Sequence, residues 1–178
     1  MSSLSHLKFR AVGDQPAFDA RALERFVSAP RVAILAYARA DGRPGQSPIW
    51  YEYRDGVFYM STVTGSPKAK ALARDGRVCL TIQDEAAPYR AAIFDGEAVL
   101  SPYSEGGPAA TLATRYLGRF GAAAYDKMTA ETYARTGLTL IALRPASVRG
   151  FDNTRGQGAG TSLYLKLRAL LPVPRAWL

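Results

Sequence analysis

Residues 31–62 decide the fold, and they read RVAILAYARADGRPGQSPIWYEYRDGVFYMST. Three segments within this stretch favour β-strand: 31–38, 46–54 and 57–62. They are separated by Asp41-Gly42 and Asp55-Gly56, and Asp-Gly is typical of tight hairpin turns because both positions tolerate a positive φ. Strands joined this closely run antiparallel. The stretch therefore predicts a three-stranded antiparallel meander.

The flanking segments add more strands and a few helices. Asp19 is predicted to cap a helix that runs to about Ala29, and Ser66 to cap a helix over 67–74. Two strands are predicted at 77–83 and 90–100, the second interrupted at Asp95-Gly96, then helices over 108–120 and 122–135. A last strand is predicted at 138–143, and 147–151 can extend the sheet.

The order of these elements favours one fold class. A doubly wound parallel sheet needs a helix between most strands, and the first three strands have none. Five or six short antiparallel strands can instead close into a small barrel. We therefore predict an α+β protein that is mainly β with flanking helices.

The composition of the chain excludes several kinds of site and catalytic mechanism. The chain has 178 residues, 48% of them hydrophobic, which is enough for one domain with a real core. It has one cysteine, Cys79, and one histidine, His6. These counts exclude an intrachain disulfide and a zinc site of four Cys and His ligands, and they argue against a Ser-His-Asp hydrolase. Any chemistry must therefore come from a bound cofactor.

The ends of the chain suggest a second region and a location. We divide the chain into a barrel domain, 1–148, and a tail, 149–178, whose Gly-rich stretch 156–161 is interpreted as a linker. The tail holds five basic residues and one acid, within a net charge of +8. Four leucines follow at helical spacing: Leu163, Leu167, Leu170 and Leu171. The chain starts without a signal-peptide pattern and has no apolar run of about 18 residues, so we expect a cytoplasmic protein.

The segment from Ser61 to Lys68 carries the strongest functional signal. It links a strand end to a helix start through Gly65, and it offers the hydroxyl groups of Thr62 and Ser66. A helix N-terminus attracts anions, and Lys68 adds a positive charge in the first turn, where the helix dipole does not favour one. These groups together could hold a terminal phosphate. The alternative is an ordinary Ser-Pro helix start with a solvated lysine.

Several stretches, taken in order, resemble one known family. They are residues 42–51, 55–62, 65–80 and 88–90, followed by Gly96. The chain is similar here to the pyridoxamine 5′-phosphate oxidase-like family of flavin-binding split β-barrels, which includes flavin reductases and deazaflavin-dependent reductases. The resemblance implies an antiparallel, Greek-key-like split β-barrel, a homodimer with the cofactor at the subunit interface, and oxidoreductase chemistry on a small molecule. Such chemistry needs no histidine, because the flavin ring carries the electron pair.

The resemblance also assigns residues. Ser61, Thr62, Ser66 and Lys68 fall in the phosphate-binding segment. Ser47, Pro48, Ile49 and Trp50 match the strand that lies along the flavin ring, and Arg90 falls near the ring edge or ribityl chain. Pro67 replaces an arginine common in the oxidases, and Ala91 replaces a glutamine. We therefore expect a relative of pyridoxamine phosphate oxidase rather than that enzyme.

The cofactor and some partners stay open. We expect FMN, with an F-420-type deazaflavin coenzyme as the alternative, since Lys70, Arg74 and Arg77 could meet its anionic tail. A non-enzymatic flavin- or haem-binding protein of this fold is a further alternative. We expect no nucleic-acid partner, and place peripheral membrane contact by the tail behind packing on its own dimer. Tyr116, Tyr125 and Tyr133 are interpreted as packing helices against the barrel.

Overall fold

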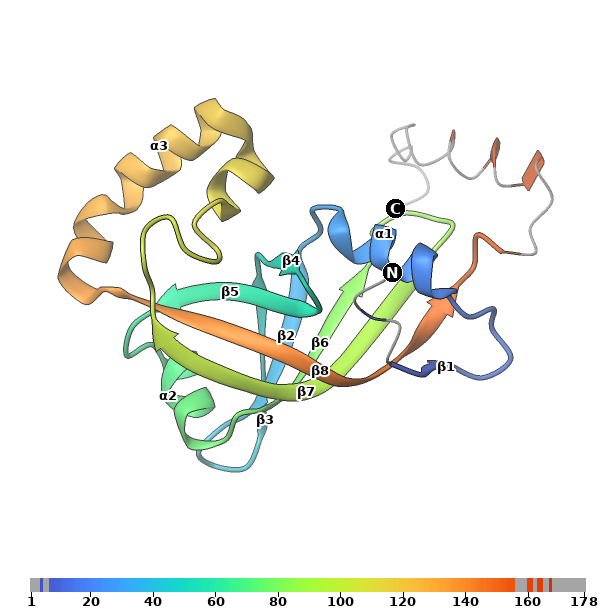
Figure 1. Ribbon diagram of the computed structural model, residues 1–178, viewed down its shortest axis with the longest axis horizontal. Helices are drawn as coiled ribbons and strands as arrows, with labels where there is room; N and C mark the ends of the chain where they lie inside the picture. The colour runs from blue at the N-terminus through green and yellow to red at the C-terminus, as the bar shows by residue number, and fades with distance from the viewer. Residues whose placement is uncertain (1–3, 5–6, 156–159, 162, 165–166, 168–178) are drawn as a thin grey trace, which may run out of the picture.

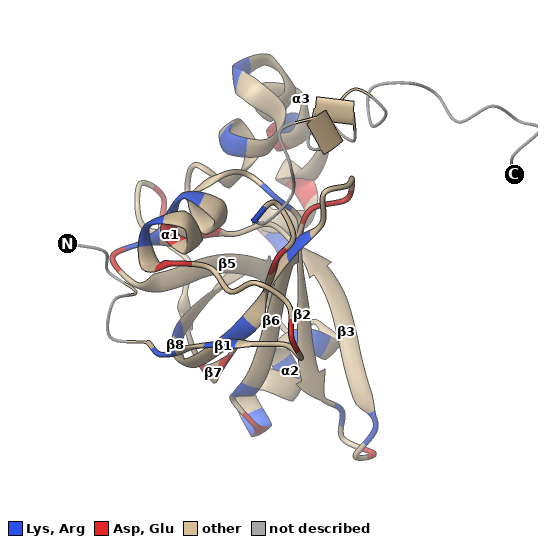
Figure 2. Ribbon diagram, turned by 90° about the vertical axis from the view of Figure 1, so that its right-hand side faces the viewer, with Lys and Arg blue, Asp and Glu red and all other residues tan. Residues whose placement is uncertain are grey.

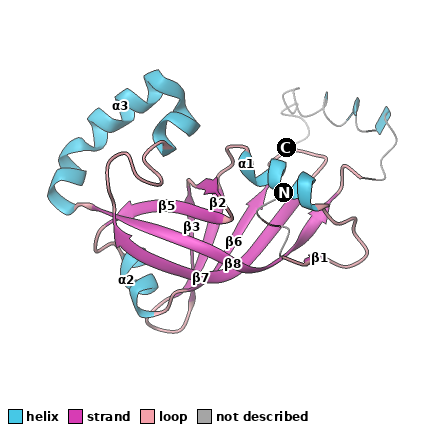
Figure 3. Cartoon of the chain, viewed as in Figure 1, coloured by secondary structure: helices cyan, strands magenta, loops and turns pink. Residues whose placement is uncertain are grey.

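The computed structural model describes residues 4, 7–155, 160–161, 163–164 and 167. The elements, in chain order, are β1 (Phe9–Ala11), α1 (Ala20–Ser28), β2 (Ala33–Ala38), β3 (Pro44–Ile49), β4 (Glu52–Arg54), β5 (Val57–Val63), α2 (Pro67–Arg74), β6 (Arg77–Gln83), β7 (Arg90–Pro102), α3 (Leu112–Thr136) and β8 (Leu138–Asp152). Within this part of the chain the strands form one sheet, and the helices flank it (Figures 1 and 3).

The sheet has the order β3-β2-β6-β7-β8-β5-β4, with β1 added beside β8. Every neighbouring pair is antiparallel except β1 and β8, which run parallel. The long strands β7 and β8 cross the molecule, with α3 near one end and α1 near the other (Figure 1). The predicted α+β fold, an antiparallel split β-barrel with flanking helices, is confirmed.

Both predicted hairpins form. Asp55 and Gly56 have φ values of 51° and 80°, and they join β4 to β5. Gly42 has a φ of 78° and lies between β2 and β3, where the Arg39 N–H donates to the Arg43 carbonyl at 2.9 Å. A glycine or an aspartate accepts this conformation at low cost, which explains why these turns could be read from the sequence.

The first two helices begin where the sequence predicts. The Asp19 carboxylate accepts a hydrogen bond from the Ala22 N–H at 2.7 Å, and the Ser66 hydroxyl accepts one from the Ala69 N–H at 3.2 Å. Helix α1 buries Leu23, Phe26 and Val27 against the sheet.

Three expectations about strands need correction. Residues 46–54 form two strands, β3 and β4, because Tyr51 turns inward, is fully buried and donates its hydroxyl to the Val27 carbonyl at 2.9 Å. Strand β7 is continuous, and Asp95-Gly96 forms an irregularity in its pairing rather than an interruption. Strand β8 is also continuous from Leu138 to Asp152.

Two further differences concern α3 and β1. The two helices predicted at 108–120 and 122–135 begin later, at Leu112, and meet at Gly118, whose φ of 69° breaks the helical backbone. Strand β1 was not predicted, because three residues are too few for a periodic pattern. Strand β1 forms through its pairing with β8, a contact between distant parts of the chain that no local pattern predicts.

Close backbone packing marks the C-terminal end of β8. Gly150 lies between β1 and β7, paired with Ala11 on one side and Ala92 on the other. A Cβ atom at this position would lie 1.9 Å from the Ala91 carbonyl oxygen. Only glycine can occupy it without moving a neighbouring strand.

Strand β3 ends the path of the sheet on one side, and two of its six residues are prolines, Pro44 and Pro48. Proline has no N–H, so it is tolerated in a sheet where that position faces away from the neighbouring strand.

Several expectations fall on residues that the structure does not describe. They concern His6, most of the Gly-rich stretch 156–161 and most of the tail helix. Within the described part, no helix is both long and apolar enough to cross a membrane. The division into 1–148 and 149–178 stays a prediction.

Candidate cofactor site

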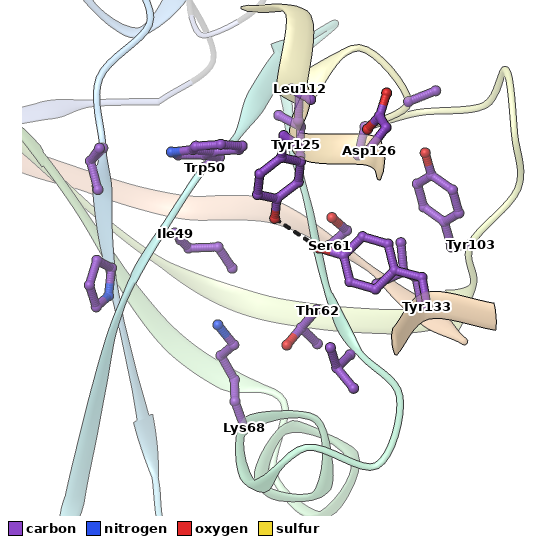
Figure 4. Close-up of a pocket in the computed structure, with 17 residues that line it drawn as sticks. Ile49, Trp50, Ser61, Thr62, Lys68, Tyr103, Leu112, Tyr125, Asp126 and Tyr133 are labelled. Carbon is purple, nitrogen blue, oxygen red and sulfur yellow. Dashed lines mark hydrogen bonds between the residues drawn. The ribbon is translucent and has the colours of Figure 1, made fainter. Parts of the chain in front are cut away.

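A cavity of about 320 Å³ lies between the ends of β3 and β5, the start of α2, and α3 (Figure 4). Its lining is aromatic and aliphatic at one side and polar at the other. The residues around it are Val32, Pro48, Ile49, Trp50, Ser61, Thr62, Val63, Lys68, Tyr103, Ala109, Ala110, Leu112, Ala113, Tyr125, Asp126, Tyr133 and Leu138.

The polar side is built by the β5–α2 connection. The Lys68 ammonium donates to the Ser47 hydroxyl at 3.0 Å, which brings β3 and α2 together. The Thr62 and Ser66 hydroxyls lie 3.3 Å apart. Helix α2 offers few backbone donors here, because Pro67 has no N–H and the Ala69 N–H already donates to Ser66. The lysine and the hydroxyl groups are therefore the main donors for a ligand.

Lys68 is a partly buried cation without a carboxylate partner. In the described residues, no acidic oxygen lies within 4.0 Å of its ammonium group, and its side chain points into the cavity (Figure 4). Burial lowers the pKa of Lys68, because the charged form loses hydration. An anion in the cavity would relieve this penalty.

The aromatic side centres on Trp50, which directly follows β3. Its ring stacks on Tyr116 at a centroid distance of 5.0 Å, and Tyr125 lies against it at 5.3 Å. The Tyr116 hydroxyl donates to the Arg31 carbonyl at 2.7 Å and accepts from the Tyr51 N–H at 3.1 Å. These bonds fix the stack, so Trp50 forms a rigid wall.

Helix α3 contributes a pair of tyrosines. The hydroxyls of Tyr125 and Tyr133 lie 2.8 Å apart and are hydrogen-bonded, while Asp126 and Tyr103 lie nearby (Figure 4). Burial, assisted by the bond to Tyr133, raises the pKa of Tyr125 to about 12. The Tyr125 hydroxyl therefore stays protonated at neutral pH. One of the two protons is shared within the pair, and the other is available to a ligand oxygen or nitrogen.

We predict that Tyr133→Phe lowers the Tyr125 pKa. The variant removes the second-largest cause of the increase but leaves the burial, so the pKa should fall and stay above the ordinary value for tyrosine. Titration of protein carrying ¹³C-labelled tyrosine, with Tyr125→Phe used to assign the signal, measures this change. An unchanged Tyr125 pKa would contradict the hydrogen bond between the two hydroxyls.

The structure brings together most of the residues assigned by resemblance. Six of them line the cavity: Pro48, Ile49, Trp50, Ser61, Thr62 and Lys68. Ser47 and Ser66 adjoin it through their bonds to Lys68 and Thr62. Arg90 lies elsewhere: its guanidinium is 2.6 Å from the Asp84 carboxylate and does not line this cavity.

Sequence reasoning missed the contribution of α3. We interpreted Tyr125 and Tyr133 as packing residues, whereas both line the cavity. Both Tyr116 and Tyr125 also pack against Trp50, as expected. The spacing of Tyr125 and Tyr133, eight residues apart on one helix, indicates a shared face but not what that face covers.

Comparison with known proteins agrees with this architecture. A conserved hypothetical protein of Mycobacterium tuberculosis has a similar structure, with a TM-score of 0.64 and 23% identity over 85% of this chain and 99% of its own. An F420 reductase matches at a TM-score of 0.51 and 20% identity, covering 70% of this chain and 94% of its own. An FAD-binding protein of Mesorhizobium loti matches at 0.51 and 18%, covering 75% and 92%. These likenesses show a common fold.

Comparison of the sequence with family models assigns the chain more closely than the structural likenesses do. No curated protein is similar enough to the chain to count as a relative. The family model of pyridoxamine 5′-phosphate oxidase, however, matches residues 20–152, which span the sheet from α1 to the end of β8. The chain therefore belongs to the pyridoxamine 5′-phosphate oxidase family.

Proposed function

We propose that this protein is a flavin-dependent oxidoreductase that acts on a small molecule and uses FMN. The observation that carries the proposal is Lys68: a partly buried ammonium without an acidic partner in the described residues, beside three hydroxyl groups. Family membership supports the same assignment. The departures at Pro67 and Ala91 argue against pyridoxamine phosphate oxidase activity itself.

The cavity fits a flavin in its donor chemistry. Lys68, Thr62 and Ser66 would hold the phosphate, because a cation and hydroxyl donors match its oxygens. Trp50 and the backbone of Pro48 and Ile49 would bound the ring system on its apolar side. A flavin supplies hydride or electron-pair transfer when it is bound.

The chain's own residues have defined parts in that chemistry. Trp50, fixed by its stack on Tyr116, would orient planar ligands and exclude water. The Tyr125–Tyr133 pair holds a proton at a hydroxyl oxygen that faces the cavity, where it can hydrogen-bond to a substrate oxygen or nitrogen. A tyrosine hydroxyl is protonated at neutral pH, and the raised pKa of Tyr125 keeps it so at more alkaline pH as well.

A deazaflavin coenzyme is the second candidate. An F420 reductase shares the fold, and basic side chains continue along α2 beyond Lys68, at Lys70 and Arg74. Arg74, however, already donates to the Ala38 carbonyl at 2.7 Å. This bond fixes the guanidinium of Arg74 beside β2, and the ion pair of Arg77 with Asp75 at 2.7 Å offsets the charge of that cation, so FMN remains the first candidate.

Titration of the purified protein with FMN and, separately, with the deazaflavin coenzyme tests the proposal. Fluorescence is expected to show saturable binding of FMN and weaker binding of the deazaflavin. Tighter binding of the deazaflavin than of FMN would make the deazaflavin the cofactor instead of FMN. If neither binds, the cavity is not a flavin site and the Ser66-Pro67 segment is an ordinary helix start.

We also propose that the protein is a homodimer. Helix α3 buries only Leu112 and Ala122, while Phe120 and Met128 are 96% and 73% exposed. A second copy would cover these apolar side chains and enclose the cavity that α3 borders. Light scattering should therefore give twice the mass of 19.3 kDa. If the protein were a monomer at micromolar concentration, the proposed site would not lie at a subunit interface.

A further inference from the structure

A second polar pocket lies at the α1 end of the molecule, away from the cavity at Lys68. It encloses about 240 Å³ and is lined by residues from four parts of the chain: α1, the segment after it, the start of β7, and the end of β8 with the residues that follow. Four arginines line it: Arg25, Arg31, Arg90 and Arg155. Figure 2 views the molecule from this end, with basic positions on α1.

Two of these arginines are held in place by one carboxylate. Asp84 accepts from Arg31 at 2.9 Å and from Arg90 at 2.6 Å, one through each oxygen. Both guanidinium groups also lie over the Phe26 ring, with carbon-to-centroid distances of 4.2 and 4.8 Å. Asp84 bonds only the Nε atom of each arginine, so the Arg90 terminal nitrogens make no hydrogen bond within the described residues.

The charges around the pocket do not balance. Arg31 and Arg90 share Asp84, and Arg155 contacts Asp19 and lies 4.0 Å from Asp152. Asp152 also faces the pocket, but its Oδ1 accepts from the Thr154 N–H and hydroxyl. Arg25 makes no hydrogen bond or ion pair within the described residues and approaches Asp19 only at longer range. Around the pocket itself, four guanidinium groups therefore meet three carboxylates, which leaves one positive charge in excess, and a further carboxylate, Glu85, is exposed on a neighbouring groove.

A larger groove with both apolar and charged walls adjoins this pocket. It encloses about 850 Å³ and shares Arg31, Arg90 and Thr154 with the arginine pocket. Its other walls include Pro30, Pro88 and the Tyr116 ring, which stacks on Trp50, together with the carboxylates of Asp84 and Glu85. A molecule with an anionic end in the pocket could thus place its organic part in the groove.

We propose that the arginine pocket binds the phosphoryl group of a phosphorylated organic molecule, with the organic part in the adjoining groove. Guanidinium groups recognise phosphate through paired N–H donors, and here they are pre-oriented by Asp84 and Phe26. This site is separate from the proposed flavin phosphate position, because none of its four arginines lines the Lys68 cavity.

Calorimetric titration with phenyl phosphate, phenol and inorganic phosphate near physiological salt tests the site. Phenyl phosphate should bind more tightly than inorganic phosphate, and phenol should not bind measurably. Arg25→Gln and Arg90→Gln should each weaken phenyl phosphate binding about tenfold or more, since each removes a charge-assisted donor. Arg119→Gln, an equal charge change at an exposed position on α3, is the matched control and should bind as the wild type does.

The same titration in Lys68→Met separates this site from the flavin site. Unchanged phenyl phosphate binding in that variant, with loss in Arg25→Gln, supports the proposal whether or not FMN binds. Loss of phenyl phosphate binding in Lys68→Met, with unchanged binding in Arg25→Gln, would assign the binding to the Lys68 cavity. That result would overturn the proposal. Absence of saturable binding in the wild type would also overturn it. Because Arg25 is exposed and packs little, its variant should fold even if Arg90→Gln does not.

Discussion

Replacing Lys68 with methionine should weaken FMN binding about 10- to 100-fold. The substitution keeps most of the length and the apolar body of the side chain but removes the charge, and a charge-assisted hydrogen bond contributes about 1.5–3 kcal/mol. Fluorescence titration of the variant against the wild type measures the loss. Lys8→Met, at an exposed position directly before β1, is the control and should bind normally.

The pH dependence of this binding provides a second readout. Burial lowers the pKa of Lys68 in the free protein, whereas a bound phosphate favours the charged ammonium and raises it. Affinity should therefore fall as the pH rises through the lowered pKa of the free protein. In Lys68→Met this part of the pH dependence should disappear.

The variant should also separate binding from folding. Without ligand, Lys68→Met should be at least as stable as the wild type, because the buried charge is gone. Unchanged affinity for FMN in a folded Lys68→Met protein would contradict the phosphate assignment.

The second large effect is expected at Gly150, where Gly150→Ala should lower the free energy of unfolding by about 3 kcal/mol or more. The new methyl group would lie 1.9 Å from the Ala91 carbonyl oxygen and 3.1 Å from the Ala92 Cα, so β7 and β8 would have to separate. The backbone φ of +156° adds strain for any residue with a side chain.

Urea unfolding followed by circular dichroism measures this loss. Gly160→Ala is a suitable control, because a Cβ there would meet nothing within 4 Å. Equal stability of the two variants would mean that β8 can move away from β7 without cost, which would contradict the observed packing.

Sequence reasoning succeeded where local chemistry decides the structure. The Asp-Gly turns and the helix caps at Asp19 and Ser66 depend on residues within a few positions of each other, so their patterns are visible in the chain. The family resemblance then placed Trp50 and Lys68 in one site, which alternation and spacing alone could not do.

The errors arose where distant contacts override a local pattern. Residues 50–54 alternate like a strand, yet Tyr51 is held inward by Val27 and by Tyr116, which lies 65 residues further along the chain. The assignment of Arg90 to the flavin stays a prediction, because Asp84 and Phe26 hold its guanidinium outside the Lys68 cavity of this chain. Tyr125 and Tyr133 could not be recognised, because helical spacing does not show which surface a helix covers.

The prolines of β3 affect how the protein behaves in concentrated solution. A strand at the end of a sheet can recruit a strand from another molecule through its outward N–H groups, which is a common start of aggregation. Pro44 and Pro48 remove two such donors from a strand of six residues, and Gln46 is the residue midway between them. This edge is therefore a poor template for intermolecular strand pairing, although the polar end of the cavity begins on the same strand at Ser47.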